Sequence, residues 1–151
     1  AMFGLKSSSA QDNSPCLLKN VGVSEFNKQH LRLASYAVEF NQLAEELAER
    51  EPDASDWKRV DAVFSRVTLF VATHFREEEA IMRKFDYPGY PGHKVQHDKF
   101  VNDLAKVQSQ INDRNVKFKG KMSTLLWDWL YHHINEIDVE YREFFAGKGL
   151  T

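Results

Sequence analysis

The chain has little of several features that mark common protein classes. Its single cysteine, Cys16, cannot form a disulfide within the chain, and neither a cysteine cluster for zinc nor a glycine-rich phosphate loop is present. No apolar run reaches the roughly 18 residues needed to cross a bilayer, and the N-terminus lacks the apolar core of a signal peptide. We therefore expect a soluble, cytoplasmic protein with no membrane span.

An excess of charge of one sign is also lacking. The chain has 20 lysines and arginines against 22 aspartates and glutamates, a formal net charge of −2, and no basic stripe. Such a balance provides no positively charged surface that would attract a polyanion, so we expect no nucleic-acid partner. No Ser/His/Asp or Cys/His set suggests nucleophilic catalysis. The residues that remain to carry chemistry are histidines and carboxylates.

The length and composition fit one domain with a real core. Of 151 residues, 42% are hydrophobic and 11 are phenylalanine. Residues 1–19 show no apolar period and are expected to form an irregular lead-in, from which Leu17 and Leu18 could dock on the domain. The domain is expected at residues 20–146, followed by a short tail at 147–151.

Four amphipathic stretches occupy this domain. The first two are expected at residues 24–50, capped by Ser24, and from a cap at Ser55 or Asp56 to residue 84. The third should begin near Pro91, which suits a first helical turn, and the fourth follows a short link and runs for roughly 25 residues. Similar lengths and short links predict an all-α, antiparallel up-down-up-down four-helix bundle.

Five of the six histidines fall on the apolar stripes of these helices. A single core histidine can be satisfied by a local hydrogen bond, but five would each need a polar partner, at about 1–3 kcal/mol for each one lost. Two pairs, His74 with Glu78 and His93 with His97, are four residues apart and so share a helix face. Because imidazole and carboxylate ligate transition metals, a shared metal centre explains the whole group. The five are His30, His74, His93, His97 and His133.

The fourth helix offers two competing histidines. His132 and Glu136 have the usual spacing of four, but they share a face with Asp128, Asn135 and Glu143, which we expect to be solvated. His133 instead falls on a stripe with Leu126, Trp129, Leu130, Ile137, Tyr141 and Phe144. Its carboxylate would then be Asp138, five residues on and about 140° around a regular helix. We therefore expect either a π-type bulge there or an oblique approach by the aspartate.

These motifs resemble those of the hemerythrin family, and of bacterial hemerythrin domains in particular. The resemblance covers residues 20–146 and rests on Gln29-His30, HFREEEAIM at 74–82, the Tyr87-Pro88 turn, HKVQH at 93–97 and WLYHHINEID at 129–138. One departure is Asn27, where the family usually has aspartate. Another is the lack of a tryptophan upstream of the VGV run at 21–23.

The resemblance implies a non-haem centre of two iron ions (Fe2+/Fe3+) with an oxo or hydroxo bridge. By position, three histidines would hold one iron, two would hold the other, and two carboxylates would bridge, which leaves one open position on the iron with two histidines. Oxygen would bind there and be held as hydroperoxide. The first iron would take His93, His97 and His133, the second His30 and His74, and the bridges Glu78 and Asp138.

The donor set favours oxygen binding over an enzyme. Five imidazoles outnumber two carboxylates, the E-x-x-H pairs of di-iron oxygenases are absent, and the pocket expected at Phe75, Trp129, Leu130 and Ile134 should be dry. We expect a monomeric O2 carrier, store or delivery protein serving an O2-consuming enzyme. The alternatives are an O2 or redox sensor with a signalling partner, and a di-iron enzyme with peroxidase-like or nitric-oxide-related activity. At least one of Glu77 and Glu79 is expected on a solvated face.

Overall fold

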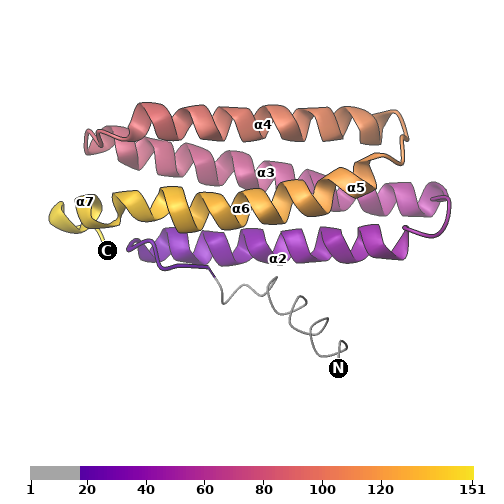
Figure 1. Ribbon diagram of the computed structural model, residues 1–151, viewed down its shortest axis with the longest axis horizontal. Helices are drawn as coiled ribbons and strands as arrows, with labels where there is room; N and C mark the ends of the chain where they lie inside the picture. Colours follow the sequence, from indigo (N-terminus) through magenta and orange to yellow (C-terminus); the bar gives the residue numbers. More distant parts are fainter. Residues whose placement is uncertain (1–17) are drawn as a thin grey trace, which may run out of the picture.

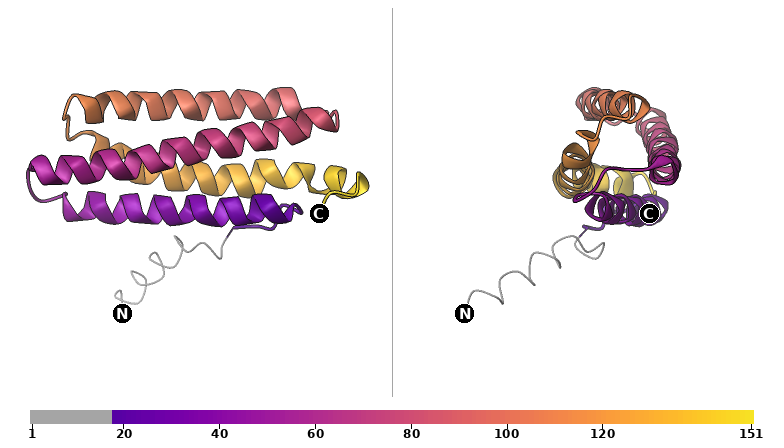
Figure 2. Two further views of the ribbon diagram at one scale, coloured as in Figure 1. Left: turned by 180° about the vertical axis from the view of Figure 1, so that it is seen from behind. Right: turned by 90° about the vertical axis from the view of Figure 1, so that its right-hand side faces the viewer.

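Four long helical segments make up the computed structural model, which describes residues 18–151 apart from the side chains of Met122 and Ser123. Three of the segments are the helices α2 (Ser24–Glu46), α3 (Ala54–Lys84) and α4 (Tyr90–Asn112) (Figure 1). The fourth segment, residues 118–147, is a chain of shorter helical pieces. Seen end-on, the segments surround one core (Figure 2), and α2 contacts α3, α3 contacts α4, and the fourth segment contacts both α2 and α4. The expected all-α four-helix bundle is confirmed.

The fourth segment changes helix type along its length. Its pieces are α5 (Phe118–Ser123), the π-helix η2 (Thr124–Asp128), α6 (Trp129–His132), the π-helix η3 (His133–Ile137), the 3-10 helix η4 (Asp138–Tyr141) and α7 (Arg142–Gly147). The π-type bulge expected from the His133 and Asp138 spacing is therefore confirmed. π turns are rare and concentrate at functional sites.

The wide turn of η3 alters which residues face the core. Ile134, Asp138, Tyr141 and Phe145 are buried, whereas Ile137 and Phe144, expected on the buried stripe, are only partly buried. Asn135, expected on a solvated face, is 5% exposed, so that expectation was wrong. A π turn takes more residues than an α turn, so positions downstream no longer follow the regular period.

The expected helix caps were also partly wrong. At the start of α2 the N-cap residue is Val23, and no side chain caps the helix. The α3 cap is Asp53, which forms a capping box with Asp56. Asp56 is buried and also binds Arg50, whose hydrogen bonds hold the pKa of the Asp56 carboxyl well below its usual value. The expectation that a proline begins the third helix is confirmed, because Pro91 lies in the first turn of α4.

The ends of the described chain pack against the bundle. Leu18 and Leu150 are partly buried against the core, so part of the expected lead-in and part of the expected tail contact the domain. Residues 1–17, Leu17 among them, lie outside the described residues. Among the helices from residue 18 onward, none is both long and apolar enough to cross a membrane.

Candidate metal centre

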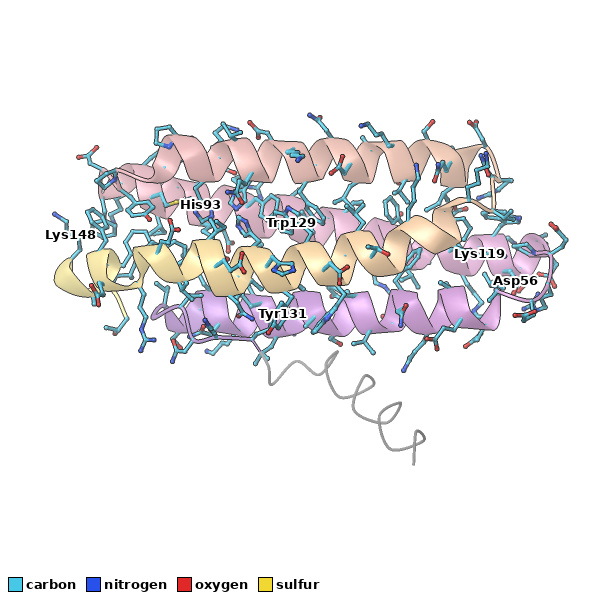
Figure 3. The ribbon with its side chains drawn as sticks, in the orientation of Figure 1. Asp56, His93, Lys119, Trp129, Tyr131 and Lys148 are labelled. Carbon is cyan, nitrogen blue, oxygen red and sulfur yellow. The ribbon has the colours of Figure 1, made fainter. Side chains whose placement is uncertain are left out.

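Seven side chains from all four segments converge inside the bundle. The ligand atoms form two overlapping groups, each within 4.8 Å, and every member is buried. Glu78 and Asp138 belong to both groups. Figure 3 shows one member, His93, in the interior between α4 and the fourth segment, with Trp129 farther along towards the middle of the bundle. The first group is Glu78, His93, His97, His133 and Asp138, and the second is His30, His74, Glu78 and Asp138.

In the three-histidine group the imidazole nitrogens face one another. The Nε2 atom of His133 lies 3.2 Å from Nε2 of both His93 and His97. Two imidazole nitrogens bound at right angles to one metal ion at about 2.1 Å would be roughly 3.0 Å apart. Three lone pairs pointing at a common centre repel unless a proton or a metal cation lies between them. This arrangement therefore fits a metal ion.

The two carboxylates are each divided between the groups. Glu78 places Oε1 2.8 Å from His93 Nε2 and Oε2 3.2 Å from His74 Nε2. Asp138 does the same, with Oδ1 2.9 Å from His133 Nε2 and Oδ2 3.2 Å from His30 Nε2. Each carboxylate thus points one oxygen at the three-histidine group and its other oxygen at the two-histidine group. This is the geometry that two bridging carboxylates need.

Several buried polar atoms at this centre lack a hydrogen bond. They are Nδ1 and Nε2 of His30 and both carboxylate oxygens of Asp138, although the His30 and Asp138 side chains are adjacent. A buried polar atom left without a partner costs about 1–3 kcal/mol. Ligation to a metal would satisfy His30 Nε2 and both oxygens of Asp138 together. The residues present therefore fit the group that the sequence predicts.

Without metal, the carboxylates hold protons on two of the histidines. Burial lowers the pKa of His30, but the adjacent carboxylates of Asp138 and Glu78 outweigh it and raise that pKa to about 9. Burial likewise opposes charge on His93, yet the same carboxylates raise its pKa to about 10. For His133 burial wins and the pKa is lowered. Burial raises the pKa of Glu78, but the nearby histidines hold it well below its ordinary value.

Metal loading is expected to release roughly two protons per chain from the ligands at pH 7.5, because His30 and His93 must lose theirs to offer lone pairs. Water that supplies an oxo or hydroxo bridge would release its own protons in addition. Both pKa values lie above this pH, so protons compete with the metal, and affinity should rise with pH until about pH 9 to 10. Calorimetry in buffers of different ionisation enthalpy measures the released protons. A His132→Ala variant should behave like wild type, and release near zero at pH 7.5 would contradict the expectation.

Outer side chains orient several of the histidines. Glu79 accepts from Nδ1 of His97 at 2.9 Å, and the Oε1 of Gln29 lies 2.5 Å from Nδ1 of His74. Gln96 lies 3.4 Å from Nδ1 of His133. The buried Tyr141 hydroxyl donates to Oε2 of Glu78 at 3.0 Å. None of these four was assigned a role from the sequence, although Tyr141 lies three residues after Asp138.

The flanking glutamates and the Asn27 departure have clear positions. Glu77 is exposed, as expected for at least one of the pair, whereas Glu79 is 9% exposed and faces His97. Asn27 accepts from the backbone N–H of Val21 and donates to the side chain of Asn20. Its replacement of the usual aspartate therefore acts on the loop before α2.

Aromatic and aliphatic side chains cover one side of the centre. Phe75 stacks on His97 with ring centroids 3.7 Å apart, and Trp129 stacks on His133 at 4.3 Å. An apolar cavity of about 10 Å³ lies next to them, lined in part by Phe75, Trp129 and Leu130. That is near the smallest space that can hold one water-sized molecule. Ile134 is buried but does not line this cavity.

His132 lies outside the centre. Its side chain is 63% exposed, and its Nδ1 lies 3.4 Å from Oε1 of the equally exposed Glu136. The pair with the regular helical spacing is therefore at the surface, and the pair with the irregular spacing, His133 and Asp138, lies inside.

Comparisons with known proteins indicate one family. A hemerythrin chain of Sipunculus nudus is 38% identical over 71 residues, which are 47% of this chain and 54% of that protein. Bacteriohemerythrin of Methylococcus capsulatus is 31% identical over 84 residues, 56% of this chain and 61% of that protein. A hemerythrin-like protein of Naegleria gruberi is 29% identical over 132 residues, 87% and 88% of the two chains.

The extent of these matches differs. The chain spans a little over half the length of the first two relatives and most of the third. No solved structure is a significant match. The model of the hemerythrin HHE cation binding domain matches residues 21–144, which contain all seven side chains of the centre. The chain therefore belongs to the hemerythrin HHE cation-binding domain family.

Proposed function

We propose that this chain binds O2 reversibly at a non-haem di-iron centre. The observation that carries the proposal is the division of the Glu78 and Asp138 oxygens between two groups of buried imidazoles. Such a donor set places two metal ions side by side with more neutral nitrogens than anionic oxygens. One iron would be held by His93, His97 and His133, the other by His30 and His74, with Glu78 and Asp138 shared.

The chain's own residues would hold oxygen in a dry, fixed site. When bound, the iron pair would supply two electrons to O2. Five neutral imidazoles give less anionic donation than a carboxylate-rich site, which disfavours further activation of the bound gas. Phe75 and Trp129 stack against ligand rings, and Tyr141 restrains Glu78 by its hydrogen bond. These contacts favour a rigid centre from which water is excluded.

We call the side chains of Phe75, Trp129, Leu130 and Ile134 the apolar wall, and their composition supports the oxygen pocket that we propose there. The small cavity is lined almost wholly by carbon and lies beside Phe75 and Trp129, which stack on rings of the three-histidine end. Phe75 also contacts the ring of His74 at the two-histidine end, with ring centroids 6.0 Å apart. An apolar cavity stays dry and accepts apolar guests, and O2 is one. No protein donor in this wall would readily protonate bound oxygen, which supports holding the gas over consuming it.

Metal analysis and optical spectroscopy test the proposal together. We expect about two irons per chain after anaerobic loading with Fe(II), an absorption change on exposure to O2, and reversal when the gas is removed. One zinc per chain, or no iron after reconstitution, would refute the site. Irreversible oxidation on first exposure, with hydrogen peroxide or an oxidised substrate appearing, would indicate an enzyme instead.

The proposed physiological role is an O2 carrier, store or delivery protein in the cytoplasm. It would act as a monomer, with residues 20–146 as the binding domain and an O2-consuming enzyme as the recipient. The family match and the metal-binding cluster support the binding function. The transport role is part of the proposal. It is tested by comparing the rate at which O2 is released with the rate at which the iron centre is irreversibly oxidised in air.

A sensor is a second candidate because the lead-in is tied to the centre. The backbone N–H of Lys19 donates to Oδ1 of Asn135 at 2.8 Å, and Asn135 lies between His133 and Asp138 in the chain. The carbonyl of Asn20 accepts a hydrogen bond from Arg142, which lies four residues after Asp138 in the chain. A shift of the ligand-bearing π turn would therefore reach the segment that precedes the bundle.

Hydrogen exchange tests this link. Metal loading should slow exchange of the Lys19 amide in wild type, because a fixed Asn135 keeps its hydrogen bond closed for longer. Asn135→Ala should abolish that protection, whereas Asn112→Ala, an exposed change at the end of α4, should retain it. Equal exchange at Lys19 with and without metal in wild type would exclude coupling through this bond.

A further inference from the structure

The outer nitrogens of the clustered histidines have unlike partners at the two ends of the centre. His97, in the three-histidine group, donates from Nδ1 to the carboxylate of Glu79 at 2.9 Å. His74, in the two-histidine group, faces the amide oxygen of Gln29 at 2.5 Å, and His133 faces the amide oxygen of Gln96 at 3.4 Å. A carboxylate thus contacts a ligand ring directly at the three-histidine end, whereas a neutral amide does so at the two-histidine end.

Both partners fix the ring tautomer. An ionised carboxylate only accepts hydrogen bonds, so Glu79 requires the proton on Nδ1 of His97 and leaves the Nε2 lone pair facing the centre. The amide of Gln29 could point either way, but its Nε2 donates to the exposed Glu77. Its oxygen must therefore face His74. The two histidines are oriented alike, and the difference between them is the charge of the partner.

Glu79 has a cationic neighbour in addition to His97. Its side chain is 12% exposed and lies 3.6 Å from Nζ of Lys94, which also binds Asp98 at 2.8 Å. Lys94 and His97 both lie on α4, so the lysine attracts the Glu79 carboxylate of α3 towards the helix that carries His97. Because Lys94 is shared with Asp98, it neutralises Glu79 only in part.

We propose that Glu79 is a positioning residue that makes the metal at the three-histidine end easier to oxidise than the metal at the two-histidine end. A carboxylate that accepts the N–H of a ligating imidazole makes the ring more basic and so stabilises the higher oxidation state. An amide does this more weakly. The inference rests on the proposed di-iron function and adds an order to its two one-electron steps: the first electron leaves from the end that carries Glu79.

The test exchanges the two partners. Glu79→Gln keeps an acceptor of the same shape without the charge, and Gln29→Glu adds a charge at the other end. Mediated spectroelectrochemistry of the iron-loaded protein gives both one-electron potentials. We expect Glu79→Gln to raise the lower potential and Gln29→Glu to lower the higher one. Each should reduce the stability constant of the mixed-valent state by about tenfold, which is 59 mV for one electron.

Two control variants separate this role from general effects. Asp98→Asn removes a carboxylate from the same lysine without contacting His97, so it should shift the potentials far less. Glu79→Asp keeps the charge and should restore much of the wild-type spread. Unchanged potentials in Glu79→Gln at full iron content would overturn the proposal, as would equal shifts in Glu79→Gln and Asp98→Asn.

A second readout covers loss of iron. If Glu79→Gln fails to retain iron, the Gln29→Glu arm alone decides, and an unchanged spread there overturns the proposal. The cobalt(II)-loaded protein offers exchangeable, shifted N–H resonances of the ligand histidines, one of which should change in Glu79→Gln. If wild type binds fewer than two irons, the proposed function fails, while this cobalt measurement still decides whether Glu79 holds His97.

Discussion

Replacing His133 with alanine is expected to abolish stable binding of the metal pair, whereas replacing its neighbour His132 should leave binding almost unchanged. His133 is 3% exposed, and its Nε2 meets those of His93 and His97. Its loss removes one of three nitrogens from that end and also leaves Asp138 without its nearest imidazole. Iron content should fall from about two per chain to roughly one or fewer.

The adjacent histidine provides the matched control. His132→Ala makes the same chemical change one residue away at a side chain that is mostly in solvent. Both proteins are loaded anaerobically with Fe(II), and iron is measured after gel filtration, with circular dichroism to check that both are folded. Equal iron loss in the two variants would mean that the assignment of the fourth segment is wrong.

Enlarging the apolar wall is expected to speed irreversible oxidation without releasing iron. Leu130→Ala opens the cavity beside the ligand rings, and Ile134→Ser brings a hydroxyl into a buried position. Either change admits water to a site that otherwise excludes it, so conversion to the diferric state should accelerate by roughly tenfold. Iron content should not change, because neither residue is a proposed ligand. Stopped-flow spectroscopy under cycled O2 follows both steps.

The loss of packing caused by a smaller side chain must be separated from the admission of water to the metal centre. Leu130→Ala should cost about 2–5 kcal/mol of folding stability through the lost packing. Leu43→Ala provides a control, because Leu43 is as buried as Leu130 and lies 13 residues along α2 from His30, about 20 Å. Similar acceleration in Leu43→Ala would attribute the effect to general loosening of the bundle.

Most of the fold was predictable because the buried stripes are regular. Along α2 and its C-cap, steps of four and three residues predict a buried stripe, and all seven of its members are buried. They are Phe26, His30, Leu33, Ala37, Phe40, Ala44 and Leu47. The histidines could be recognised as a group because polar side chains recur at apolar positions on every helix.

The residues after His133 could not be placed from the period alone. The spacing to Asp138 indicated a bulge, but not which later positions it would bury. Asn135 was expected in solvent and Ile137 in the core, but the π turn η3 buries Asn135 and leaves Ile137 partly exposed. A helical stripe assumes a constant rotation per residue, so one wide turn makes every later assignment uncertain.

The missed partners share a different cause. Glu79 follows Glu78 in the chain, and nothing local tells which acidic residue turns inward and which meets another helix. Its contact with His97 depends on how α3 packs against α4.

The cap at Asp53 was missed because Ser55 and Asp56 offered equally good local signals, and only the observed pairing of Asp56 with Arg50 and Asp53 separates them.

The π turn η3 lets the fourth segment tolerate a change of length. Deleting one residue between His133 and Asp138, for instance Glu136, would let η3 relax to an ordinary α turn. A turn closed by an i→i+5 bond and a turn closed by an i→i+4 bond both return close to their starting direction. Asp138 would therefore still face the same way relative to His133, and Tyr141 would still reach Glu78. In alignments of related chains, a gap of one residue in this stretch would therefore be compatible with an intact metal centre.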